Sequence, residues 1–373
     1  MRRVLLELAD ELAGDLASEE LEGLENILWA RRQGLHLLTA SDGLFAALAG
    51  AAKLDERERK ILDKSRDQQF QKKALLRAVQ RRVRVSRDTG PSLERDGDLE
   101  IAIVPLRHFA RYGVADRAVV LGEGEPDARM AVRMARYFAH TNRGLERIPL
   151  HHHVATGSGG STSVHLRLYR ERPCFCIGVV DSDRAAPDCE EGETATKARR
   201  EVDDAKPWVG LHVLACRAME NTLPSGLMEA ALVEDKQIRR ALDDLERFDE
   251  GGALARYRDY CDFKKGTRLE WVLRPANEDA RSFWLGPEAP LTAAPSVDEG
   301  CLSQLACPKG KDACTCVVAH GFGQPLLETC VDAAEKMPDQ ELEALLCEKT
   351  KPHWRALGRT VFSWVCGAGE TRV

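Results

Sequence analysis

The chain has 373 residues, more than one hydrophobic core usually organises, so we expect two or three domains. Its formal net charge is −6, from 54 basic and 60 acidic side chains, which argues against a protein that coats nucleic acid by bulk charge but leaves a local basic face open. With 43% hydrophobic and 31% charged residues, the composition is that of an ordinary soluble protein and not of a disordered chain.

The N-terminus bears on cellular location. Two arginines open the chain, but Glu7 and Asp10 interrupt the apolar stretch that follows, so we expect no signal peptide. No apolar run approaches the roughly 18 residues that a membrane span needs. We therefore expect a cytoplasmic protein that meets no membrane, in which the twelve cysteines are thiols or metal ligands rather than a disulfide framework.

Residues 1–87 have the periodicity of helices. Leu5, Leu8, Leu12 and Leu16 recur at helical spacing, and no alternating pattern typical of a strand interrupts the segment. We predict an all-α bundle of five or six short helices. Lys72 to Arg87 holds seven basic residues and no acid, which indicates a solvated helix face or, alternatively, a surface for phosphates or an acidic partner.

The bundle resembles a death-effector-type domain. The stretches that carry this resemblance are "VLLELADELAGDLASEELEGLENIL", "GLFAALAGAAKLDERERKIL" and "QKKALLRAV", with the charged signature of that family approximated by Lys72, Lys73, Leu75 and Leu76. The resemblance implies homotypic association with a second helical bundle, by self-assembly or by recruitment to a partner.

The pattern changes after residue 87. Residues 86–98 carry turn and breaker residues and are predicted as a linker, and we assign residues 88–115 to the linker and a leading strand. Five short apolar runs follow, at 99–106, 117–122, 148–157, 173–181 and 208–216, and helical stretches at 126–141, 161–170 and 192–203 separate the last four. Strands alternating with helices predict an α/β domain over 116–224 with a mainly parallel sheet. Residues 225–373 are predicted as a helical, cysteine-bearing extension.

Acidic residues stand where the predicted strands end. Glu123 follows the first strand of the domain, Asp181 and Asp183 follow the third, and Arg217 and Glu220 follow the fourth. Ligands gather at the carboxyl ends of parallel strands. Carboxylates brought together there repel one another unless protons or cations compensate, and Mg²⁺ suits them because it prefers hard oxygen ligands. One or two such ions would activate water and brace a phosphodiester.

The order of these motifs, "VVLGEGEPDA", then "CIGVVDSDR", then "RAMENTLP", resembles the Toprim nucleases of OLD type and of bacterial anti-phage systems. The resemblance implies Mg²⁺- or Mn²⁺-dependent cleavage of DNA or RNA in antiviral defence. It implies that Glu123 is a general acid/base or metal ligand, that Asp181 and Asp183 are metal ligands, and that Arg217 and Glu220 support catalysis. Asp127 matches a motif position that is more often structural, and we include it as a fourth candidate metal ligand.

Other interpretations of the same residues remain open. Acids at strand ends also cap helices or lie in turns, and Arg217 and Glu220 would form an ion pair on a helix start. "DSDRA" also resembles the nucleophile motif of haloacid-dehalogenase phosphatases, although the "EGEPD" unit would then be unexplained. The glycine-rich "GSGGS" at 157–161 is either a phosphate-binding turn or a tight structural turn, and we favour the latter.

The C-terminal cysteines allow a second metal. Cys301, Cys307, Cys314 and Cys316 could close a tetrahedral Zn²⁺ site, although their spacing departs from paired zinc knuckles. The main prediction is thus a metal-dependent nuclease. The alternative is a non-catalytic signalling adaptor whose Toprim-like domain binds a nucleotide or a partner.

Overall fold

The structure of the protein is a computed structural model. It describes residues 4–51, 53–69, 73–87, 90–111, 114–116, 118–172, 174–233, 236–250, 252–272, 278–286, 297, 300–301 and 315–367. The chain divides into two compact units. Unit 1 comprises Met1–Val179, Lys197–His212 and Arg355–Val373, and unit 2 comprises Val180–Thr196 and Val213–Trp354.

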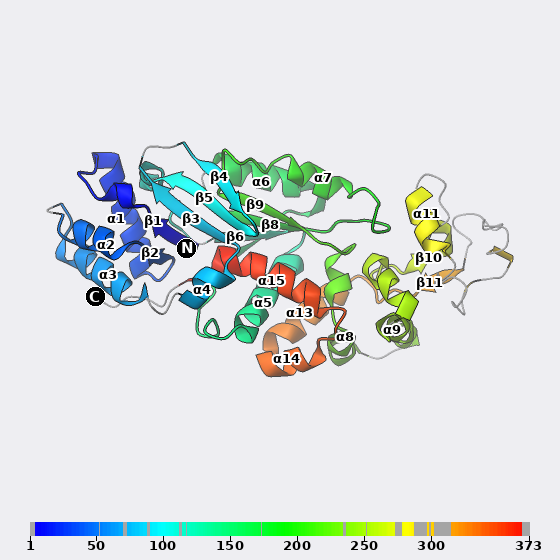
Figure 1. The fold of residues 1–373 in the computed structure, drawn as a ribbon. Helices are drawn as coiled ribbons and strands as arrows, with labels where there is room; N and C mark the ends of the chain where they lie inside the picture. The colour runs from blue at the N-terminus through cyan, green and yellow to red at the C-terminus, as the bar shows by residue number, and fades with distance from the viewer. Residues whose placement is uncertain are drawn as a thin grey trace. The chain divides into compact units, whose positions relative to one another are not determined.

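Unit 1 begins with a five-stranded sheet in the order β2-β1-β3-β5-β4 (Figure 1). Its strands are β1 (Leu5–Leu8), β2 (Leu37–Thr39), β3 (Arg81–Ser86), β4 (Ser92–Asp96) and β5 (Leu99–Pro105). β1 pairs in parallel with both β2 and β3, β3 pairs in parallel with β5, and only β4 is antiparallel to its neighbour. The N-terminal segment is therefore α/β.

The prediction of an all-α bundle over residues 1–87 is wrong, because three of these strands lie inside it. Leu5 and Leu6 are fully buried, so β1 lacks the alternation that marks a strand with one solvated face. Its four residues also fit a helical spacing of leucines. The homotypic association inferred from a death-effector-like bundle loses its structural basis. Lys72 lies outside the described residues.

Helices do form at most of the predicted places in this segment. They are α1 (Ser18–Arg32), α2 (Asp42–Ala49), α3 (Glu56–Asp67) and α4 (Lys73–Ala78), with the 3-10 helix η1 (Asp10–Leu12). A further 3-10 helix of unit 1, η3 (Leu106–Ala110), follows β5. α2 ends at Ala49, with Gly50 as its C-cap. Figure 1 shows α1, α2 and α3 beside β1 and β2.

The arginine-rich stretch after residue 80 is a strand and not a helix face. Within β3, Val83 and Val85 are fully buried, while Arg82 pairs with Glu7 at 3.1 Å. Just after the strand, Arg87 pairs with Glu20 at 3.3 Å. These arginines thus face acids of unit 1 instead of forming an open basic surface. The predicted linker 86–98 contains β4, which forms a hairpin with β5.

The second sheet has the order β7-β6-β8-β9 and confirms the predicted parallel α/β arrangement. Its strands are β6 (Ala118–Gly122), β7 (His152–Thr156), β8 (Cys176–Val180) and β9 (Val209–Val213), and the helices that connect them are α5 (Glu125–Thr141), the 3-10 helix η4 (Gly159–Ser161), α6 (Thr162–Glu171) and α7 (Glu193–Arg199). β6 is parallel to both β7 and β8, with Leu121 opposite Gly178 in the latter pair. The chain therefore leaves β6 and β8 at the same edge of the sheet.

Close packing of α5 against α15 (Lys351–Val365) holds this sheet in place. A Cβ at Gly358 would lie 2.4 Å from the carbonyl oxygen of Met134, so the backbones of the two helices approach closely at this glycine. The rings of Phe138 and Phe362 are 5.5 Å apart. α5 directly follows the turn that carries Glu123, so this packing holds the helix at the end of that turn.

Unit 2 is mainly helical. Its elements are η5 (Met219–Thr222), α8 (Ser225–Ala231), α9 (Lys236–Asp249), η6 (Gly252–Tyr260), β10 (Thr267–Arg268), α10 (Leu269–Val272), α11 (Glu278–Trp284), β11 (Val317–Ala319), α13 (Leu326–Lys336) and α14 (Asp339–Leu345), and the ends of α7 and α15 reach into it. The core includes the fully buried Phe248, Tyr257 and Trp284. Among the described residues, no helix has the length and apolar character that crossing a membrane requires.

Candidate functional site

In unit 1, Glu123 lies in a tight turn between β6 and α5. Gly122 is needed for this turn, because a Cβ there would lie 2.5 Å from the carbonyl oxygen of Gly124 and 2.7 Å from the amide of Ala128. Glu123 is partly exposed, and its side chain starts from the edge at which β6 ends. The turn therefore presents a carboxylate at the end of a buried parallel strand, as the sequence predicted.

The other two acids of this turn have different environments. Asp127 is 9% exposed, and its Oδ2 accepts a hydrogen bond of 2.8 Å from the backbone N–H of Gly124. This contact caps the first turn of α5, which is the structural role that we expected for the position. Glu125 is exposed on the same turn. Of the three acids, Glu123 remains the candidate for chemistry, and Asp127 has a carboxylate oxygen committed to the helix.

The "GSGGS" stretch braces the Glu123 turn from the neighbouring strand. Gly157 donates its N–H to the carbonyl oxygen of Gly122 at 2.8 Å, and Gly159 donates to that of Glu123 at 3.0 Å. Ser158 and Gly159 both have positive φ angles, 51° and 61°. Because two of its amides are used in this way, the stretch is a structural turn and not a cradle for phosphate.

In unit 2, Asp181 and Asp183 stand on either side of a firmly held serine. Ser182 is fully buried and donates its hydroxyl to the carbonyl oxygen of Cys216 at 2.7 Å. Its own carbonyl accepts the N–H of Gly192 at 2.8 Å. A few residues on, the indole N–H of Trp284 donates to the carbonyl oxygen of Ala185 at 2.8 Å. The backbone that carries both carboxylates is therefore well anchored.

The two carboxylates of this motif differ in their contacts. Asp181 is half-buried, and its Oδ1 accepts the backbone N–H of Met219 at 3.0 Å. Asp183 is exposed and has φ +52°, in the left-handed region that non-glycine residues rarely occupy. Its carboxylate forms no hydrogen bond or ion pair with any described residue. Gly192 packs against it so closely that a Cβ there would lie 2.6 Å from the Asp183 Cβ.

The third motif provides support around these carboxylates. The guanidinium of Arg217 lies over the ring of Trp271, 4.7 Å from its centroid. Glu220 is 1% exposed and pairs with Lys264, whose Nζ lies 2.9 Å from its Oε1. The ion pair that we considered between Arg217 and Glu220 is thus replaced by one between Glu220 and Lys264. Asn221 donates its amide to the carbonyl oxygens of Arg258 and Cys261, at 2.7 and 3.0 Å.

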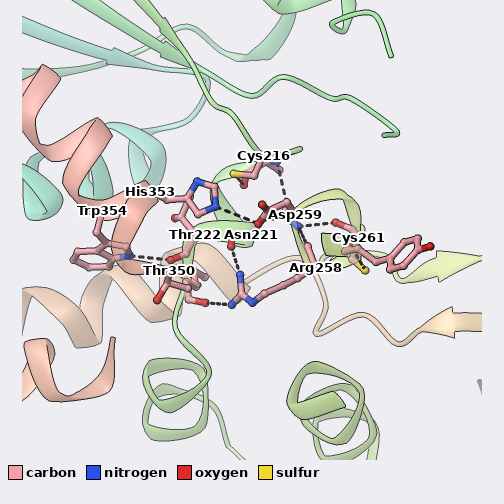
Figure 2. A network of polar contacts seen from close by, with 12 residues as sticks. Cys216, Asn221, Thr222, Arg258, Asp259, Cys261, Thr350, His353 and Trp354 are labelled. Atoms are coloured by element: carbon pink, nitrogen blue, oxygen red, sulfur yellow. Dashed lines mark hydrogen bonds and ion pairs between the residues drawn. The ribbon is translucent and has the colours of Figure 1, made fainter. Parts of the chain in front are cut away.

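Two further polar residues, Asp259 and His353, lie close to this motif and were not expected from the sequence (Figure 2). Asp259 lies at the end of η6, and its Oδ1 is 3.1 Å from Nε2 of His353 at the start of α15. Burial raises the pKa of the Cys216 thiol well above its ordinary value, and the nearby carboxylates of Asp259 and Asp181 raise that pKa further. Both carboxylates therefore lie near one buried thiol.

The donor chemistry of Glu123, Asp181 and Asp183 fits a magnesium ion, since all three offer carboxylate oxygens. In the part of the chain that the structure describes, no three His, Cys, Asp or Glu side chains converge closely enough to form a ready-made metal site. Carboxylates repel one another in the absence of a cation.

The predicted zinc ligands fall only partly within the described chain. Cys301 and Cys316 are buried, and Cys307 and Cys314 lie outside the described residues. Nearby, His320 places Nδ1 2.6 Å from Asp244 Oδ2, so this imidazole already has a carboxylate partner.

We compared the chain with models of protein families, with curated proteins and with solved structures, and none of them matches it. The resemblance to Toprim nucleases therefore remains a prediction from the motifs.

Proposed function

We propose that the protein is a Mg²⁺-dependent nuclease of Toprim type that cleaves phosphodiester bonds of DNA or RNA. The observation that carries this proposal is the state of Asp183. Its carboxylate is exposed and without a partner among the described residues, while its backbone is held in a left-handed conformation. Such a conformation costs free energy and persists where the surroundings enforce it, which is typical of functional sites.

In this proposal Asp181 and Asp183 would hold the cation. The resemblance of the motifs assigns Glu123 the role of a metal ligand or of the group that moves a proton to or from the reacting oxygen. When bound, the ion would polarise the phosphodiester and lower the pKa of an attacking water. The hydrogen bond from the backbone N–H of Met219 helps to fix the orientation of the Asp181 carboxylate.

The third motif has a supporting part in this mechanism. The guanidinium of Arg217 lies over the ring of Trp271, and its backbone carbonyl accepts the N–H of Asp183 at 2.9 Å, so Arg217 would support the backbone of that aspartate. Glu220 is buried with Lys264, so we assign it to the framework of the site and not to proton transfer. The resemblance of the motifs suggests that the biological setting is bacterial antiviral defence, in which cleavage of nucleic acid stops phage replication.

A cleavage assay tests the proposal. Plasmid DNA and total tRNA are incubated with the protein with and without Mg²⁺, beside Glu123→Ala and Asp181→Ala. Glu125→Ala serves as the matched control, because Glu125 is an exposed acid on the same turn as Glu123. We expect Mg²⁺-dependent cleavage by the wild type and the control, and loss of at least a hundredfold in the two variants, as for removal of a group that acts only in the transition state.

Two results would count against the nuclease. Cleavage that persists in both Glu123→Ala and Asp181→Ala would mean that other residues catalyse the reaction. Absence of cleavage under every condition, together with binding of a nucleotide or of nucleic acid, would favour the alternative of a non-catalytic adaptor.

A further inference from the structure

A cavity of about 580 Å³ in unit 1 has a wall that is both aromatic and basic. Arg107 and His108 of η3 line it, together with Arg111 just after η3 and Trp208 just before β9. Its volume lies in the range of roughly 300–1,000 Å³ that is typical of ligand sites. The cavity shares no residue with the acidic motifs, so the proposed mechanism leaves it unused.

η3 is a rigid platform because α1 packs directly on its backbone. Gly23 of α1 lies so close to the carbonyl oxygen of Leu106 that a Cβ would find no room there. Further along α1, Asn26 donates its side-chain amide to the carbonyl oxygen of Phe109 at 3.0 Å. Phe109 is fully buried, with its ring 6.3 Å from that of Phe175. The side chains of η3 that line the cavity therefore start from a fixed backbone.

His108 and Trp208 form a stacked pair in this wall, with ring centroids 4.6 Å apart and planes inclined by 30°. Trp208 is buried, and its indole N–H donates to the carbonyl oxygen of Arg170 at 2.9 Å. Nε2 of His108 has no hydrogen-bond partner among the described residues, so stacking and not a hydrogen bond of this atom positions the ring. Burial and the charge of Arg111 lower the pKa of His108 to about 4, so the ring is neutral at pH 7. Its second face can receive another planar ring.

Arg107 and Arg111 are exposed cations that have no acidic partner among the described residues. Other arginines of unit 1, on or beside β3 and β4, each pair with a carboxylate: Arg81, Arg82, Arg84, Arg87 and Arg95. An unpaired guanidinium matches the geometry of a phosphate group. Glu19 and Glu22 of α1 line the cavity too, so a phosphate would bind on the η3 side, away from these acids.

An aromatic ring beside two unpaired guanidinium groups suits a single strand of nucleic acid. Bases of a single strand stack on aromatic side chains, including histidine, with little dependence on sequence, and arginines bind the phosphates. In a duplex the bases pair and stack with one another, so their faces are not available to a protein ring. The chemistry of this wall therefore favours a single strand over a duplex.

We infer that the cavity beside η3 binds single-stranded nucleic acid, with a base stacked on His108 and phosphates bound by Arg107 and Arg111. The inference rests on the proposed function in one respect, because the strand held there would be the substrate of the nuclease. It adds a contact surface and a preference for single strands that the sequence motifs do not contain.

Fluorescence polarisation of a labelled oligothymidylate of about twelve nucleotides, titrated with the full chain in EDTA, tests the inference without cleavage. The variants are Arg107→Ala, Arg111→Ala, His108→Ala and His108→Phe. Arg57→Ala is the matched control, because Arg57 is an exposed arginine of α3 that does not line the cavity. Each affinity is measured over a series of salt concentrations, and melting temperatures are measured in parallel.

We expect each of the two arginine variants to weaken binding about fivefold at about 0.1 M salt. Each should also reduce the salt dependence, the slope of log K against log salt, by about 0.7, the value for one phosphate contact of a single strand. His108→Ala should weaken binding by about 5- to 100-fold and leave that slope unchanged, because it removes a stacked base and no charge. His108→Phe, which keeps a ring, and the control should bind like wild type. If His108→Ala folds poorly, His108→Leu, which fills the space without a ring, should show the same loss.

Unlabelled competitors identify the ligand. A single-stranded oligonucleotide should displace the probe, whereas a duplex of the same length and polyglutamate should displace it poorly. If the duplex or polyglutamate competes as well as the single strand, the surface binds anions in general and the stacking on His108 is refuted.

The remaining outcomes separate the two proposals. If the wild type cleaves nucleic acid in Mg²⁺ but the arginine and His108 variants bind the probe as wild type does, the cavity is refuted as a binding site and the nuclease stands. If the cavity variants lose the probe as expected but no cleavage occurs under any condition, the binding site stands and the nuclease is refuted. If the wild type neither binds the probe nor cleaves, both proposals are refuted.

Discussion

Substitutions at Asp183 should affect stability and activity differently, because the residue has a left-handed backbone conformation that costs free energy and an exposed carboxylate that we propose binds the cation. Its φ of +52° lies in the left-handed region, where a residue with a Cβ pays about 1–2 kcal/mol that glycine does not. Aspartate and asparagine pay less than alanine there, since their short polar side chains bond locally. We compare the variants Asp183→Gly, Asp183→Asn and Asp183→Ala.

The expected order of stability follows from two opposing terms. Glycine removes the left-handed penalty but costs about 0.4–1 kcal/mol through the greater freedom of the unfolded chain. The glycine variant should therefore be about 1 kcal/mol more stable than the alanine variant, with asparagine close to wild type. For a domain of roughly 160 residues, the size of unit 2, this difference corresponds to about 3 °C in melting temperature.

Thermal melting and Mg²⁺-dependent cleavage are measured on the same samples. All three variants should lose cleavage, because each lacks the carboxylate, whereas their melting temperatures should follow the order glycine, asparagine, alanine. An alanine variant as stable as the glycine variant would refute the left-handed conformation in solution. An asparagine variant that cleaves like wild type would refute the role of the charge.

Three further predictions follow from contacts around the site and elsewhere. Gly192→Ala should reduce cleavage by about a hundredfold, because the new Cβ would lie 2.6 Å from the Cβ of Asp183 and would displace that residue. Gly90→Ala is the control and should cleave normally, because its Cβ would meet nothing within 4 Å. Equal cleavage by the two variants would contradict the packing of Gly192 against Asp183. Lys264→Met should lower the free energy of unfolding by about 3 kcal/mol, because it removes the ammonium group that pairs with the buried carboxylate of Glu220. Adding Glu220→Gln to this variant should recover part of the loss in denaturant melts, and no recovery would contradict the pairing. Burial lowers the pKa of His212 from 6.5 to about 4, so the neutral imidazole contributes stability that is present above pH 6.5 and is lost as the pH falls toward 4. His212→Gln should therefore show a smaller drop in melting temperature than the wild type between pH 7 and pH 5. An unchanged drop would refute the lowered pKa of His212.

The sequence predicted the second sheet because its strands are short apolar runs separated by helices that have a strong period of their own. β6 and β8 are buried at every residue and are bounded by turns, so their type and ends were visible. β1 and β2 have only four and three residues, so their leucines fitted the helical period equally well. β1 pairs with β2 on one side and with β3 on the other, with Leu5 opposite Leu37 and Leu6 opposite Val83, and no local pattern carries the information on these distant pairings.

The candidate site divides in the same way. Glu123, Asp181 and Asp183 follow directly from strand ends, so their positions could be predicted once the strands were recognised. Asp259 and His353 are 94 residues apart and meet only through tertiary packing, so neither stood out in the sequence. Glu220 shows the converse, because its place in the motif suggested catalysis whereas its burial with Lys264 indicates a structural role.

The most direct test of the metal-dependent site is anomalous diffraction from crystals of the full chain soaked in Mn²⁺. We predict an anomalous peak about 2.1–2.2 Å from carboxylate oxygens of Asp181 and Asp183, which disappears in Asp181→Asn. Absence of a peak at these aspartates in crystals that bind Mn²⁺ elsewhere would contradict the proposed function.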